Sequence, residues 1–155
     1  MTPSTVTHDT FVIERIYNVP VAQIFRAWAD PTLKSRWFAG SADALGAGYE
    51  LDFRVGGREV NRGGPPGGPV YTYKSQFHDI IPERRIVSTY EMYVDEARIS
   101  VSVATVEFHS QEATTQLLIT EQGVFLDGQD TVAQREQGTR SLLDSLAAIL
   151  SGGGS

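Results

Sequence analysis

Apolar and polar residues alternate along most of the chain, which is the pattern of strands that bury one face. The alternation is clear in residues 49–54 and returns after residue 85, where one parity holds Ile86, Ser88, Tyr90 and Met92. β-branched and aromatic residues predict a further strand at residues 10–17. The expected strands are 10–17, 49–54 with a short continuation at 58–62, 71–77, 86 to about 95, 99–108 and 114–122.

Three interruptions shape these strands. The pair Gly56 and Gly57 predicts a turn or bulge, and the Gly/Pro-rich residues 63–69 predict a hairpin loop. In residues 99–108 the apolar parity changes between Val103 and Val106, so a bulge is expected near residues 104–105. In the last strand either Leu117 and Ile119 face inward or Leu118 does.

Helical spacing replaces alternation in two regions. After the first strand, apolar residues recur at i, i+3, i+4 and i+7 over Val21, Ile24, Phe25 and Trp28. Pro31 ends this short helix and begins a second, which carries Leu33 and Trp37 four residues apart.

A long helix is predicted over residues 127–150. Thr131 or Asp130 caps its start, and Gln134 stands at capping-box spacing from Thr131. One stripe then collects Leu142, Leu143, Leu146, Ile149 and Leu150. Such a helix needs an apolar partner, so we expect it to lie across the sheet. Gly138 interrupts it at a cost of about 1 kcal/mol relative to alanine.

Composition narrows the class of protein. The 155 residues predict a single domain over residues 1–150 with a flexible Gly/Ser tail at 151–155. A net charge of −6 without a basic run argues against nucleic-acid binding. The chain has no cysteine, no signal-peptide pattern at its start and no membrane-length apolar run, so a cytoplasmic location is expected.

The ordered segments of the chain resemble a known superfamily. They are VPVAQIFRAWADP at 19–31 leading to RWF at 36–38, VGGR at 55–58, DIIPERRIV at 79–87 and TEQG at 120–123. The chain resembles the START-related helix-grip (SRPBCC) superfamily, and within it the group named after the C-terminal domain of the heat shock protein 90 ATPase activator.

The resemblance implies an α+β helix-grip fold, in which a curved antiparallel sheet holds the C-terminal helix over a cavity. Members bind lipids, sterols, polyketides or hormones, and some catalyse cyclisation or hydrolysis. Gly138 then has two interpretations. Either its missing side chain leaves room for a ligand, or it relieves a tight contact between helix and sheet.

The candidate ligand contacts are inward-facing residues of the predicted strands together with residues of the predicted helices. Tyrosines with apolar walls and a polar tip suit an amphipathic ligand, although each aromatic residue taken singly is more typical of a place in the core. The predicted ligand-binding residues are Trp37, Phe53, Tyr71, Tyr73, Phe77, Tyr90, Met92, Glu121, Gly138 and Leu142.

Glu121 is the main candidate for chemistry, because it shares the parity of Leu117 and Ile119. An inward carboxylate would act as a general base or bind a ligand cation. The alternative is a glutamate at the end of the strand that pairs with Arg54 or Arg98. Glu107 follows similar logic beside the expected bulge.

The sequence carries no motif for a metal, a nucleophile or a nucleotide. His8, His78 and His109 are dispersed, so no metal site is predicted. No nucleophile elbow, phosphate loop or dinucleotide fingerprint occurs, and no cofactor is expected.

The sequence leaves three candidate functions. The first is non-catalytic binding of a small apolar or amphipathic molecule. The second is a cyclase- or hydrolase-like enzyme with Glu121 as base and Tyr73 or Tyr90 orienting the substrate. The third is a chaperone-binding module. A homodimer is compatible with each of them.

Overall fold

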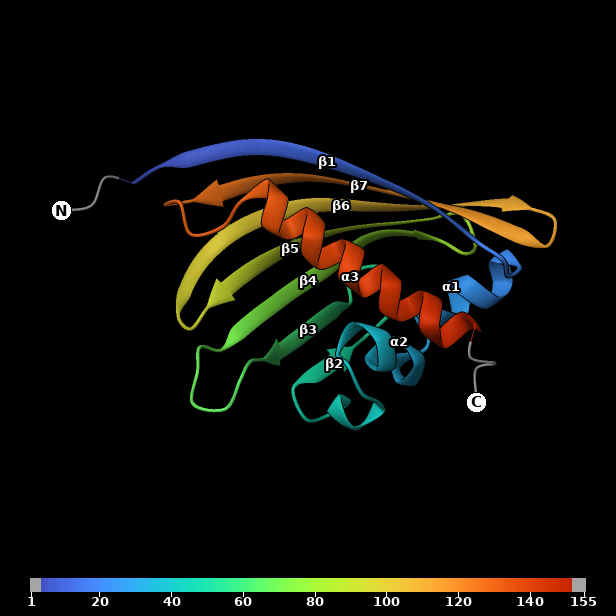
Figure 1. Cartoon of the computed structure of the whole chain (residues 1–155), viewed down its shortest axis with the longest axis horizontal. Coiled ribbons are helices and arrows are strands. Elements are labelled where there is room, and N and C mark those ends of the chain that lie inside the picture. Colours follow the sequence, from blue (N-terminus) through green and yellow to red (C-terminus); the bar gives the residue numbers. More distant parts are fainter. Residues whose placement is uncertain (1–3, 152–155) are drawn as a thin grey trace.

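The computed structural model describes residues 4–151 and has the α+β architecture that the sequence predicts. One antiparallel sheet curves around a long C-terminal helix, α3 (Val132–Ser151), and two short helices lie at one end of the sheet (Figure 1). The strands are β1 (Val6–Tyr17), β2 (Tyr49–Leu51), β3 (Arg58–Gly63), β4 (Tyr71–Ile81), β5 (Arg85–Val94), β6 (Ala97–Gln111) and β7 (Thr114–Leu126). The short helices are α1 (Val21–Ala29) and α2 (Pro31–Phe38), followed by the 3₁₀ turn η1 (Ala42–Ala44).

The sheet is a meander with one crossover. Its strand order is β1-β7-β6-β5-β4-β3-β2, so each strand from β2 to β7 pairs with the next along the chain. β1 instead pairs with β7 over its full length, from Val6 opposite Leu126 to Tyr17 opposite Thr115. The chain therefore leaves one edge after β1, passes through α1 and α2, and re-enters at the other edge. This path places α2 near the short strands β2 and β3.

The long helix lies across the concave face, as its apolar stripe predicts (Figure 1). Thr131 caps it by accepting a hydrogen bond from the Gln134 amide at 3.1 Å, which confirms the predicted cap. Leu143 and Leu146 are fully buried, and the Tyr17 hydroxyl donates to the Leu143 carbonyl oxygen at 3.1 Å. The C-terminal half of α3 is thereby attached to β1.

Aromatic residues fill the core beneath α1 and α2. Asp30 caps α2 by accepting hydrogen bonds from the Thr32 and Leu33 amides. The Trp28 and Trp37 rings meet at 4.7 Å, and the Trp37 indole donates to the Ala27 carbonyl oxygen at 2.9 Å. These contacts pack one end of the molecule tightly. The space under the first half of α3 is less densely filled.

Residues 58–62 do not continue the preceding strand. β2 ends at Leu51, and residues 52–57 turn the chain so that β3 runs antiparallel to β2. Gly56 has a positive φ of 85°, and a Cβ on Gly57 would lie 2.1 Å from the Asp52 carbonyl oxygen. Only glycine fits these two positions without a shift in the backbone.

The predicted bulge in β6 is also misplaced. The register is regular at residues 104–105 and shifts instead at Ile99, which is skipped between Ser100 opposite Met92 and Arg98 opposite Tyr93. Beyond this bulge the inner face carries Ser100, Ser102, Ala104, Val106 and Phe108. Val101 and Val103 face outward and are 37% and 41% exposed. Small polar residues thus occupy the inner face, against the expectation from hydrophobicity alone.

The last strand is longer than predicted. β7 reaches Leu126, and Leu117, Ile119 and Glu121 all face inward. Residues 152–155 of the predicted tail lie outside the described residues, while Ser151 is the last residue of α3. Within residues 4–151, no helix is long and apolar enough to cross a membrane.

Candidate functional site

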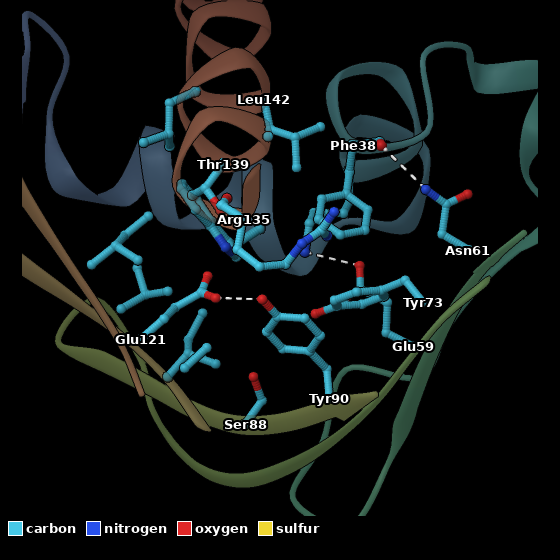
Figure 2. A pocket seen from close by; sticks show the side chains of 18 of the residues that line it. Phe38, Glu59, Asn61, Tyr73, Ser88, Tyr90, Glu121, Arg135, Thr139 and Leu142 are labelled. Carbon is cyan, nitrogen blue, oxygen red and sulfur yellow. Dashed lines mark hydrogen bonds and ion pairs between the residues drawn. The ribbon is translucent and has the colours of Figure 1, made fainter. Parts of the chain in front are cut away.

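A cavity of about 310 Å³ lies between the sheet and the first half of α3. Most of its wall is apolar, and polar side chains reach it from β3, β5, β7, α2 and α3 (Figure 2). The lining residues are Trp28, Lys34, Trp37, Phe38, Glu59, Asn61, Tyr73, Phe77, Ile86, Ser88, Tyr90, Met92, Ala104, Val106, Ile119, Glu121, Arg135, Gly138, Thr139, Leu142 and Leu143.

Small residues in the middle of the sheet leave room for this cavity. Two rows of residues that are paired across neighbouring strands run over the inner face of the sheet. Each row mixes large and small side chains. One row is Ser75, Tyr90, Ser102 and Gly123, and the next is Phe77, Ser88, Ala104 and Glu121. Of the small residues in these rows, Ser88 and Ala104 line the cavity, and their side chains leave a hollow where larger ones would close it.

The helix supplies the opposite wall. Arg135, Gly138, Thr139 and Leu142 line the cavity at spacings of three, four and seven residues, which is one face of α3. A Cβ built on Gly138 would meet no heavy atom within 4 Å. Gly138 therefore does not relieve a tight contact, and its missing side chain leaves open space at the cavity wall.

The first polar cluster of the cavity centres on Glu121. This residue is only 7% exposed, and the Tyr90 hydroxyl donates a hydrogen bond to its Oε1. Figure 2 shows the two side chains pointing toward one another, with Arg135 and Thr139 above them on α3. Burial raises the pKa of the Glu121 carboxyl to about 7, and the opposing effects of Tyr90, Arg135 and Thr139 are smaller.

Arg135 is held in place by the residues that begin α3. Its Nε lies 3.0 Å from Oδ2 of the buried Asp130, whose Oδ1 also accepts from the Thr131 amide at 2.9 Å. The positive charge of Arg135 is thus compensated locally, and it lowers the pKa of Glu121 only in part. Glu121 faces the cavity, and near neutral pH its carboxyl group is present in both the protonated and the ionised form.

The second polar cluster lies where α2 meets β3. Lys34 and Glu59 are 3% and 1% exposed, and the Lys34 Nζ lies 2.9 Å from the Glu59 Oε2. The Tyr49 hydroxyl donates to the same oxygen at 2.5 Å. The Lys34 ammonium also lies over the Phe38 ring, 4.4 Å from its centroid. Asn61 lies on the same face of β3 as Glu59 and lines the cavity.

Comparison with known proteins places this architecture in a family. The profile described as "Activator of Hsp90 ATPase homolog 1-like protein" matches residues 18–151. The chain belongs to this family. The match confirms the resemblance seen in the ordered segments and covers everything from the end of β1 to the end of α3.

Solved structures of two rhizobial proteins have the same fold. An uncharacterized protein from Rhizobium leguminosarum is 41% identical with a TM-score of 0.90, and covers 97% of this chain and 99% of its own. A protein from Rhizobium loti is 44% identical with a TM-score of 0.86, and covers 93% of this chain and 98% of its own. No protein of curated function matches significantly.

More distant structures show the fold alone. DynU16, a protein of the dynemicin biosynthetic locus, is 17% identical with a TM-score of 0.68. The alignment covers 94% of this chain and 48% of that protein. The family thus establishes the helix-grip fold, and the chemistry of the site has to be argued from this chain's own residues.

Eight of the ten predicted ligand-binding residues line the cavity of this family member. They are Trp37, Tyr73, Phe77, Tyr90, Met92, Glu121, Gly138 and Leu142. Phe53 does not, because it follows β2 and packs edge-on against Phe25 and Phe77 in the core. Tyr71 does not either, since it begins β4 at the rim of the sheet and is 45% exposed.

The predicted arginine partners of Glu121 are engaged elsewhere. Arg54 pairs with Asp52 and Arg98 with Glu91, each at 2.9 Å. Because β7 continues for five residues past Glu121, this residue is well inside the strand and not at its end. Glu107 is not a cavity residue, since it points to the outer face and lies 3.6 Å from His109.

The charged residues Lys34, Glu59 and Arg135 were not predicted as part of the site. Their positions depend on pairing between elements distant in the sequence, and charged residues are ordinarily exposed. For Arg135 a signal existed, because it is three residues before Gly138 on the same helix face. Across residues 4–151, no three metal-binding side chains gather in one place.

Proposed function

We propose that this protein binds a small, mainly apolar molecule in the cavity under α3. The supporting observation is an unfilled space of about 310 Å³ with a predominantly apolar wall and two buried polar clusters. Small-molecule sites range over roughly 300–1,000 Å³ and combine apolar walls with a few fixed polar groups. The cavity lies at the lower end of that range, which favours a compact ligand.

The construction of the walls supports binding over incomplete packing. Cavities are costly in ordinary cores, and each removed methylene destabilises a fold. Here the space is framed by glycine on the helix and by serine and alanine on the sheet, from elements that are distant in the sequence. Hydrogen bonds within the protein hold the side chains of Glu59 and Glu121 in place, so these polar groups are preorganised for a ligand.

The decisive experiment fills the cavity from the helix. Gly138→Leu places a side chain into the open space at the cavity wall, and Gln137→Leu, at a neighbouring position that is likewise exposed but does not line the cavity, is the matched control. We expect fluorescence titration with 2-naphthol to show binding to the native chain and to Gln137→Leu. Gly138→Leu should bind at least tenfold more weakly, while its melting temperature is not lowered, because leucine is the better helix former. Equal binding by all three proteins would refute the proposal.

A second candidate function is general-base catalysis. The specific observation is that Glu121 is inside the cavity, unpaired with Arg54 or Arg98, and hydrogen-bonded to Tyr90. In a hydrolase-like reaction its carboxylate would take a proton from water as the water oxygen attacks an ester carbonyl. The protonated Glu121 would then return this proton to the alcohol oxygen as the ester C–O bond breaks. A general base typically contributes about 10²–10⁴-fold to the rate.

Hydrolysis of 2-naphthyl acetate tests this candidate. Enzymatic turnover should depend on Glu121, so Glu121→Gln should lower kcat/KM by about a hundredfold or more. If the native chain and the variant hydrolyse the ester at the rate of buffer, catalysis of this type is excluded and the binding function is unaffected.

The chaperone-binding hypothesis rests on the family's name. The cavity, by contrast, is a physical feature of this chain. We therefore place the function in the cavity, and a pull-down that recovered a heat shock protein 90 homologue with Gly138→Leu as efficiently as with the native chain would reassign it to the surface.

A further inference from the structure

The two polar clusters differ in what they offer a ligand, and this difference defines a class of molecule. Resting on the proposed binding function, we propose that the ligand is a flat, uncharged molecule. It carries a carbonyl oxygen that accepts from Lys34 and a hydroxyl group that bonds to Glu121.

Lys34 supplies the donor for the carbonyl group. Its ammonium carries three N–H donors, and the ion pair with Glu59 at 2.9 Å uses one of them. The ring of Phe38 makes a cation–π contact with one side of this ammonium group. Since the residue is only 3% exposed and lines the cavity, its other donors have little access to bulk water. A ligand oxygen that accepts from Nζ would satisfy a donor that the fold leaves available.

Charge balance favours a neutral carbonyl over a carboxylate. Among the described residues that line the cavity, Lys34 is paired with Glu59, and Arg135 is paired with Asp130 behind it. A ligand carboxylate at Lys34 would therefore lie beside the Glu59 carboxylate without any uncompensated positive charge. The desolvation of that extra anion would have no matching gain.

Glu121 favours a hydroxyl group at the other cluster. One of its oxygens accepts from Tyr90, and a carboxyl group retains further acceptor capacity in both protonation states. Burial raises the pKa of Glu121 to about 7, so both states are populated near neutral pH. A hydroxyl group can donate to the ionised form and accept from the protonated form. An ammonium group could only donate, and a carbonyl group could only accept.

The ring of Tyr73 connects the two clusters and favours a flat ligand body. Its centroid lies 4.8 Å from that of Tyr90 and 5.1 Å from that of Phe38, which contacts Lys34. Burial and the negative charges of Glu59 and Glu121 raise the pKa of the Tyr73 hydroxyl, so this group stays protonated and uncharged. Figure 2 shows the Tyr73 ring next to that of Tyr90. An aromatic ligand stacked on these rings would reach both clusters.

A matched series of naphthalenes tests the inference. The probes are naphthalene, 2-naphthol with the hydroxyl alone, 2-acetylnaphthalene with the carbonyl alone, and 6-acetyl-2-naphthol with both. The fifth probe, 6-hydroxy-2-naphthoate, replaces the carbonyl by a carboxylate. Titration at pH 7 should give the lowest Kd for 6-acetyl-2-naphthol, with each polar group adding about tenfold, as one net hydrogen bond of about 1.4 kcal/mol would.

Two variants assign the groups to their clusters. In Lys34→Met/Glu59→Gln the ion pair is removed as a unit, and the amide oxygen introduced by Glu59→Gln still accepts from Tyr49, which keeps the fold intact. This variant should abolish the gain from the acetyl group and keep the gain from the hydroxyl. Tyr90→Phe/Glu121→Leu should do the reverse. Circular dichroism and the Kd of naphthalene confirm that each variant retains the fold and the cavity.

The outcomes separate this inference from the proposed function. If no probe binds, the binding function itself fails. If all five bind with one Kd, the cavity binds ligands but the polar clusters do not select them, and the inference is overturned. It is equally overturned if 6-hydroxy-2-naphthoate binds more tightly than 6-acetyl-2-naphthol.

Discussion

Tyr90 on β5 and Glu121 on β7 are joined by a hydrogen bond that crosses the inner face of β6. The bond is possible because the residues of β6 beneath it, Ser102 and Ala104, are small. Ala104 also lines the cavity, so the same small side chain contributes to the space for a ligand and to the contact between the two polar side chains. The carboxyl of Glu121 is thereby buried in a place where its protonation depends on its neighbours.

Replacement of Glu121 by glutamine should change how stability depends on pH. The pKa of Glu121 is about 7 in the folded chain and near 4.5 when the chain is unfolded. Between these values the folded state binds more protons, so the free energy of unfolding falls as pH rises, by up to about 3 kcal/mol in total.

Urea denaturation of native protein and Glu121→Gln at several values from about pH 5 to pH 8 measures this effect. The contribution of Glu121 is fully present below its unfolded pKa and lost as pH rises through its folded pKa. The variant should therefore gain stability relative to the native chain as pH increases. Parallel curves for the two proteins would show that the Glu121 carboxyl is not perturbed.

Tyr90→Phe should raise the pKa of Glu121 further. The Tyr90 hydroxyl stabilises the ionised carboxylate, and phenylalanine removes that donor while keeping the ring against Tyr73. Carbon-13 NMR titration of the glutamate carboxyl signals, with Glu121→Gln to assign the signal, measures the shift. Tyr93→Phe is the control, since its hydroxyl bonds to Glu91 on the outer face. An unchanged Glu121 pKa in Tyr90→Phe would mean that the hydrogen bond has little effect on ionisation.

The sequence predicted the fold because its patterns are local and mutually consistent. Alternation located most strands, and the inward parity of Ile119 correctly carried Glu121 into the interior. The prediction from alternation was wrong for Val101 and Val103, which face outward, because Ser100, Ser102 and Ala104 occupy the inner positions of this strand. In this strand Ala104 lines the cavity, so a small side chain stands where a packed core would hold a larger one, and the β-branched Val101 and Val103 lie on the outer face.

The second polar cluster was invisible for a different reason. Lys34 and Glu59 are 25 positions apart, and charged residues are ordinarily exposed. They are buried because α2 docks against β3 and brings the two charges together. A contact of that kind depends on the packing of two elements, which single-sequence patterns do not encode.

Two glycines should respond in opposite ways to the same substitution. At Gly123 a new Cβ would lie 2.8 Å from the buried Phe125 ring and 3.2 Å from the Ser102 Oγ, so Gly123→Ala should destabilise the fold by about 1–3 kcal/mol. At Gly138 a Cβ meets nothing within 4 Å, so Gly138→Ala should stabilise the helix by up to about 1 kcal/mol. Urea midpoints of both variants measure the difference. Stabilisation by Gly123→Ala would show that Phe125 can move away without cost.

The buried pair of Lys34 and Glu59 should show strong energetic coupling. Lys34→Met leaves the Glu59 carboxylate buried, with Tyr49 as its remaining partner among the described residues, which should cost about 3–5 kcal/mol. Adding Glu59→Gln removes that isolated charge, so the double variant should be more stable than Lys34→Met alone. The exposed pair of Arg98 and Glu91, also at 2.9 Å, is the matched control, and its coupling should stay below about 1 kcal/mol. If a double-mutant cycle gives both pairs the same small coupling energy, Lys34 is hydrated in solution. Its ammonium would then already be satisfied by water, and a carbonyl ligand would gain nothing from it.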